Sequence, residues 1–76
     1  MKMSFDQFQQ SVVDSFPNGN TRYGQYWFNL LNAIRPSIAD KIRGTVDDPY
    51  YLDRVPTRTE QIVATLWADE RAHDEV

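Results

Sequence analysis

Three aspartates in the middle of the sequence are the first residues that could do chemistry. Asp47 and Asp48 are adjacent and Asp53 follows nearby, and carboxylates are ligands that hard divalent cations prefer. Two adjacent carboxylates rarely reach one ion without further ligands, and the EF-hand spacing is absent. Asp48 precedes Pro49, a pair that is typical of turns. We therefore expect turn residues here and no metal site.

Groups that could catalyse a reaction are few along the chain. His73 is the single histidine, there is no cysteine, and no serine stands at a recognisable nucleophile spacing. We expect this histidine to be solvated rather than to act as a general base. Gly19, Gly24 and Gly44 are scattered, and no Gly-Lys-Ser/Thr phosphate loop follows any of them. The sequence predicts a protein that is not an enzyme and that uses no cofactor.

Five cationic side chains fall within one stretch of the chain and could together contact phosphates. They are Arg35, Lys41, Arg43, Arg54 and Arg58. Tyr50 and Tyr51 lie among them and could stack on bases. Four aspartates share the stretch, and the chain has 8 Lys and Arg against 11 Asp and Glu, a net charge of −3, whereas nucleic-acid-binding domains are usually basic. We expect the arginines to pair with neighbouring aspartates, and nucleic-acid binding remains an alternative.

Aromatic residues are abundant for so short a chain, with two Trp, four Tyr and four Phe among 76 residues. Each ring can bury roughly 150–250 Å², but a chain of this size buries only about 60% of the surface that its unfolded form exposes. Rings that do not fit would form an exposed patch, which usually marks a partner surface or a homodimer seam. Tyrosine and arginine are enriched among the residues that dominate such surfaces. The candidate contact residues are Tyr26, Phe28, Arg43, Tyr50, Tyr51 and Arg54.

The first predicted helix covers residues 5–15. Ser4 and Gln7 have the capping-box spacing at its start. Apolar residues recur on one helical face, and they are Phe5, Phe8, Val12 and Phe16. Pro17 cannot continue the helix, so a turn follows.

The second predicted helix, residues 22–34, has the strongest pattern. Its apolar stripe recurs in steps of three and four residues, and its members are Tyr23, Tyr26, Trp27, Leu30, Leu31 and Ile34. We expect Asn20 or Thr21 as the N-cap. Phe28 lies off the stripe, so it either widens the buried face or is exposed. Gly24 weakens the first turn by roughly 1 kcal/mol relative to alanine, and such a glycine often permits the close approach of another helix.

A short helix and an irregular segment come next. Pro36 suits the first position of a new helix, which we expect over residues 37–43. Gly44 suits the position just beyond its end. Residues 45–56 contain turn signals and no partner strand, so we expect turns whose two tyrosines fold back on the core.

The last predicted helix covers residues 58–70. Thr57 and Glu60 have the spacing of a second capping box, and residues 71–76 are acidic and polar and are expected to fray. The whole sequence predicts an all-α fold and a single domain over residues 1–76. We expect a compact small bundle of three main helices plus one short helix, with the irregular segment packed across it.

Part of the sequence resembles small uncharacterised proteins of tailed bacteriophages and prophages. The resemblance covers roughly the middle third of the chain: Phe28-Asn29 in a helix, Arg-Pro-x-Ile-Ala-x-x-Ile-Arg-Gly-Thr over residues 35–45, and Asp-Pro-Tyr-Tyr over residues 48–51. It implies expression in the cytoplasm of an infected bacterium, where phage proteins of this size commonly bind a host protein. The resemblance brings no assigned activity with it.

A membrane location is not expected. The longest uncharged run, Tyr23–Ile34, is shorter than the roughly 20 residues of a bilayer span, and the N-terminal residues show no apolar signal region. The sequence therefore predicts a phage-type cytoplasmic protein that binds another protein, with a host factor as the expected partner. The alternatives are a nucleic-acid-binding module that uses the cations of residues 35–58, and a homodimer with a structural role.

Overall fold

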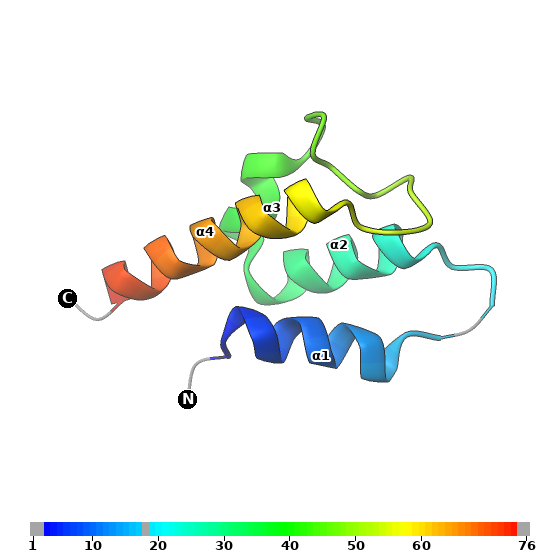
Figure 1. The fold of residues 1–76 in the computed structure, drawn as a ribbon, viewed down its shortest axis with the longest axis horizontal. Coiled ribbons are helices and arrows are strands. Elements are labelled where there is room, and N and C mark those ends of the chain that lie inside the picture. Colours follow the sequence, from blue (N-terminus) through cyan, green and yellow to red (C-terminus); the bar gives the residue numbers. More distant parts are fainter. Residues whose placement is uncertain (1–2, 18, 75–76) are drawn as a thin grey trace.

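Four α-helices make up the computed structural model, which describes residues 3–17 and 19–74, with side chains up to residue 70 (Figure 1). They are α1 (Phe5–Ser15), α2 (Tyr23–Ile34), α3 (Pro36–Ile42) and α4 (Thr57–Asp74). No strand occurs among these residues, so the predicted all-α class is confirmed. α1 and α2 run in opposite directions, and α4 runs in the same direction as α2 because the segment after α3 returns the chain (Figure 1).

The starts of the first two helices show one correct and one wrong prediction. α1 has its predicted range, and Ser4 and Gln7 form the capping box, in which the Ser4 amide donates to Gln7 Oε1 at 2.8 Å. Neither Asn20 nor Thr21 caps α2, since Arg22 is the N-cap residue and makes no side-chain hydrogen bond there. α2 must therefore satisfy its first amides in another way.

α4 differs from its prediction at both ends. Its first residue is Thr57, and the Glu60 amide already donates to the Pro56 carbonyl at 3.1 Å. The Glu60 carboxylate accepts a hydrogen bond from Gln9 Nε2 at 2.7 Å, so the side chain that the predicted capping box needs is directed to α1. The helix continues to Asp74, beyond the predicted end at residue 70. The predicted fraying of residues 71–76 stays a prediction, and residues 75 and 76 lie outside the described residues.

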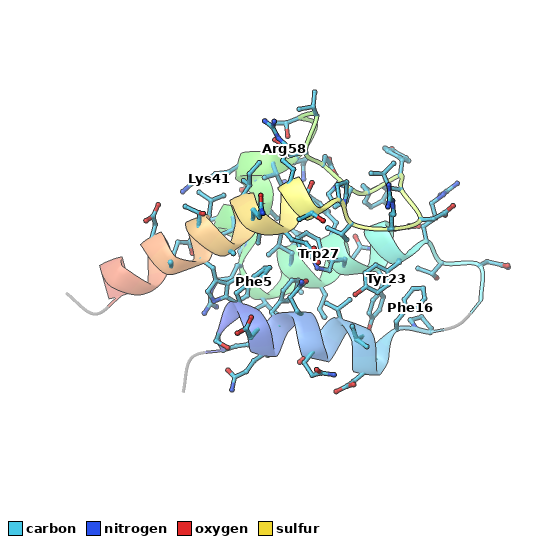
Figure 2. The ribbon with its side chains drawn as sticks, viewed as in Figure 1. Phe5, Phe16, Tyr23, Trp27, Lys41 and Arg58 are labelled. Atoms are coloured by element: carbon cyan, nitrogen blue, oxygen red, sulfur yellow. The ribbon has the colours of Figure 1, made fainter. Side chains whose placement is uncertain are left out.

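The core is built around aromatic rings from three helices. Phe8 packs edge-on against Trp27, with ring centroids 5.3 Å apart, and lies 5.2 Å from Trp67. Figure 2 shows Trp27 between α1 and α4. Trp27 Nε1 donates to Gln9 Oε1 at 2.5 Å, and Trp67 Nε1 donates to the Met3 carbonyl at 2.9 Å. Both buried indoles are thus hydrogen-bonded, which avoids the cost of an unpaired buried donor.

The irregular segment 45–56 packs on the first turn of α2. The Gly24 amide donates to the Leu52 carbonyl at 3.0 Å, so this segment supplies a cap that Arg22 does not. A Cβ atom on Gly24 would lie 2.2 Å from the Pro49 carbonyl oxygen and 2.6 Å from that of Leu52. Only glycine admits this contact. The close approach expected at Gly24 is therefore made by a loop and not by a helix.

We expect Gly24→Ala to lower the free energy of unfolding by about 1–2 kcal/mol. Overpacking costs typically about 1–3 kcal/mol, and an approach of 2.2 Å to a main-chain atom belongs to the upper part of that range. Alanine returns at most about 1 kcal/mol through its helix propensity. Urea denaturation followed by circular dichroism measures the difference. Gly19→Ala is the matched control, because its Cβ would meet no atom within 4 Å, and equal stability of the two variants would contradict the loop contact.

Candidate binding surface

An open hollow of about 300 Å³ lies where the segment 45–56 meets α2 and the end of α3. Its lining residues are Phe28, Asn29, Asn32, Arg43, Asp48, Tyr50 and Tyr51. The structure thus brings together four of the six candidate contact residues, although they are separated by up to 23 positions in the sequence. We call this hollow and its lining the tyrosine hollow.

Three rings connect the core to the surface in the tyrosine hollow. Phe28 is buried, with 4% of its surface exposed, and forms the floor. Tyr50 packs edge-on against it at 6.1 Å, and Tyr51 packs edge-on against Tyr50 at 4.9 Å. Tyr51 is 78% exposed. Phe28 therefore widens the buried face of α2. A contact residue would have to expose its ring to a partner, but the Phe28 ring supports the hollow from below.

Arg43 closes one side of the tyrosine hollow. Its guanidinium carbon lies 5.5 Å from the Phe28 ring centroid, one terminal nitrogen donates to the Asp40 carboxylate, and the other donates to Asn32 Oδ1 at 2.8 Å. The Arg43 side chain is 50% exposed, and an exposed ion pair of this kind contributes at most about 1 kcal/mol. The guanidinium is held in place by its neighbours while half of its side chain stays open to a partner.

The structure does not bring Tyr26 or Arg54 into the hollow. Tyr26 precedes Phe28 by two helical positions, a rotation of roughly 200°, so it faces α1. Its ring lies 5.7 Å from that of Phe16, and its hydroxyl is 2.6 Å from Ser15 Oγ. Arg54 is exposed on the loop but is not part of the lining. These two candidates are separated from the other four.

Asp48 holds the loop that carries the tyrosines. Its carboxylate accepts hydrogen bonds from the Gly44 amide at 2.7 Å and from the Tyr50 amide at 3.0 Å. Gly44 has φ 75°, a conformation that glycine adopts without strain, as expected for the residue beyond α3. Asp47 pairs with Arg58 at 3.0 Å. The described residues contain no group of three or more potential metal ligands, and both aspartates serve the turn.

Three of the five cations considered for nucleic-acid binding have partners within the protein. The guanidinium carbon of Arg35 lies 4.9 Å from the centroid of the Trp67 ring. Arg43 and Arg58 pair with aspartates, as expected from the sequence. Each of these three guanidinium groups thus has a separate local contact among the described residues.

Tyr23 lies outside the hollow, and its surroundings shift its pKa. Burial raises the pKa of Tyr23 above its ordinary value, and the nearby Glu60 carboxylate raises this pKa further. Both effects favour the protonated phenol. Its ring packs edge-on against Phe16 at 5.1 Å, at the end of the molecule that Figure 2 shows on the right.

Three lining residues were not among the sequence candidates, namely Asn29, Asn32 and Asp48. The two asparagines are three positions apart on α2 and both follow Phe28. This spacing places polar groups on one helical face and could have indicated a polar rim. No pattern in the sequence indicated Asp48, because the fold of the turn, and not a helical spacing, places its carboxylate in the lining. The exposed Val46 and Leu52 were also missed, since aromatic content alone does not point to them.

No protein-family model matches this chain, and no curated protein or solved structure matches it either. None of the helices in the described part of the chain is both long and apolar enough to cross a bilayer. The side chain of His73, expected to be solvated, lies outside the described residues.

We expect Asp48→Ala to lower the free energy of unfolding by about 1–3 kcal/mol, because two main-chain amides lose a charged acceptor. Asp47→Ala is the matched control. It removes one ion pair in which the arginine side chain is 74% exposed and the aspartate side chain is 16% exposed, and a pair that is open to solvent on one side contributes about 1 kcal/mol. Amide hydrogen exchange should become faster at Gly44 and Tyr50 in the first variant only. The same stability loss in both variants would rule out the capping role of Asp48.

Proposed function

We propose that this chain is a non-enzymatic module that binds another protein through its loop surface. The loop surface consists of Val46, Tyr51 and Leu52 together with the tyrosine hollow beside them. The distribution of exposed apolar side chains supports this proposal. Four large hydrophobic residues are exposed in the described part of the chain, and three of them, Val46 at 93%, Tyr51 at 78% and Leu52 at 43%, lie on this one loop. Tyr51 and Leu52 are adjacent in the chain, and neighbouring exposed apolar side chains are the usual basis of a partner surface.

The loop is held rigidly enough to present these side chains to a partner. Its main chain is fixed by the Asp48 carboxylate, by the bond from Gly24 to the Leu52 carbonyl, and by Thr59 Oγ1, which donates to the Asp47 carbonyl at 2.9 Å. A preorganised loop loses less conformational entropy on binding. Tyrosine is among the residues that most often dominate protein interfaces, so Tyr51 is the expected anchor.

The resemblance to phage proteins suggests which partner to test. A host protein of the bacterial cytoplasm is the proposed partner, and this step rests on the resemblance alone. Nucleic-acid binding is the weaker alternative, because Arg35, Arg43 and Arg58 each have a partner within the protein.

The test is affinity purification from bacterial lysate with quantitative mass spectrometry, after nuclease treatment. The immobilised baits are the unchanged protein and Tyr51→Ala. A hot-spot tyrosine contributes at least about 2 kcal/mol, so recovery of a direct partner should fall by about thirtyfold with the variant. The fold should be unaffected, because Tyr51 is 78% exposed, and thermal unfolding checks this.

Val13→Ala is the matched control, because Val13 on α1 is 60% exposed and lies outside the loop surface. Recovery of the partner should be unchanged with this control and restored with Tyr51→Phe, which keeps the ring. If every captured protein is recovered equally with the unchanged bait and with Tyr51→Ala, the loop surface is not the binding site.

A further inference from the structure

A second hollow lies on the outer face of α4. It has a volume of about 360 Å³, and its lining residues, all from α4, are Arg58, Gln61, Ile62, Thr65 and Leu66. Ile62 and Leu66 pack partly against the core, and the remainder of each side chain faces the hollow. Ile62 and Leu66 thus form an apolar centre in this face, with the polar Gln61 and Thr65 beside them, and no described element covers it.

Opposite charges stand at the two ends of this face. Asp69 follows Arg58 by about three full turns, so the two residues lie on the same side of α4, and both are exposed. Figure 2 shows Arg58 at the start of α4, directed away from α1. Its Nε donates to Asp47, and its terminal nitrogens make no hydrogen bond to a described residue. We call the lining residues together with Asp69 the α4 face.

We propose that the α4 face binds the same face of a second copy of this chain, with the two helices antiparallel. A two-fold axis through the middle of the face brings Arg58 of each copy to Asp69 of the other, so that two ion pairs form. The same axis places Ile62 opposite Thr65, and Leu66 opposite Gln61. A two-fold contact of this kind requires a self-complementary surface, and the charge order of the α4 face meets that requirement.

The two parts of the α4 face have different roles in this contact. The apolar middle supplies the burial that favours association. The charged ends set the direction, since parallel helices would place like charges together. Exposed ion pairs are weak and are screened by salt, so the dimer should form at high protein concentration and weaken as salt is added. The α4 face shares no residue with the loop surface, although Arg58 pairs with Asp47, the chain neighbour of Val46.

The experiment is a charge exchange followed by sedimentation equilibrium over a range of protein concentrations. Arg58→Glu places two acidic pairs in the dimer, and Asp69→Arg places two basic pairs there. We expect each single variant to lower the association constant at least tenfold. An equimolar mixture of the two variants restores both opposite-charge pairs, so the mixture should associate about as strongly as the unchanged protein.

Two controls keep the result specific. Arg22→Glu and Asp14→Arg make the same charge changes at exposed positions outside α4 and should leave association unchanged. Asp69→Arg does not touch the pair between Arg58 and Asp47, so it separates dimer loss from any loosening of the loop. A protein that stays monomeric at all concentrations would overturn the proposal, and so would a mixture that associates no better than the single variants.

Discussion

The absence of a side chain at Gly24 is the constraint on which the placement of the loop depends. The first turn of α2 has no side-chain cap, and the Leu52 carbonyl accepts the Gly24 amide hydrogen instead. The Pro49 carbonyl oxygen occupies the space that a Cβ would need. The loop thus accepts a hydrogen bond from an amide of the helix, and the helix, which has no side chain at Gly24, leaves room for the loop main chain. The position of Tyr50 and Tyr51 follows from this contact, since both lie between the two docked carbonyls.

More of the aromatic rings are buried or partly buried than we expected for a chain of this size. Phe8, Trp27, Phe28 and Trp67 are buried, and Tyr51 is the one exposed ring. The core achieves this with edge-on and tilted ring contacts, which fill space without leaving indole donors unpaired. The expected surplus of exposed rings is therefore limited to a single ring, and its role in binding stays a prediction. The rest of the exposed apolar surface of the loop is aliphatic, from Val46 and Leu52.

Local sequence signals predicted the helices well and their tertiary partners poorly. Apolar periodicity and the Ser4 capping box identified α1 and α2 within one residue, because both signals act within a few residues of the chain. The N-cap of α2 was predicted wrongly since its partner, Leu52, lies about thirty positions away. Glu60 was assigned to a local cap, but Gln9 of α1 engages its carboxylate. The candidate site shows the same limit. The apolar stripe separates Tyr26 from Phe28, but only the packed neighbours show that Tyr26 faces α1 and that Phe28 supports the hollow.

The residues that carry the resemblance to phage proteins are mostly those that shape the loop. Ile38, Ala39 and Ile42 anchor α3 in the core, Gly44 turns the chain with φ 75°, and the Asp48 carboxylate holds the turn that follows. A protein with the same motif would form the same loop frame whatever side chains stand at its exposed positions. Val46 interrupts the motif and is almost fully exposed, so it can change without cost to the frame. The motif residues therefore fix the frame of the loop, and the chemistry of its surface depends on the exposed side chains that the frame presents.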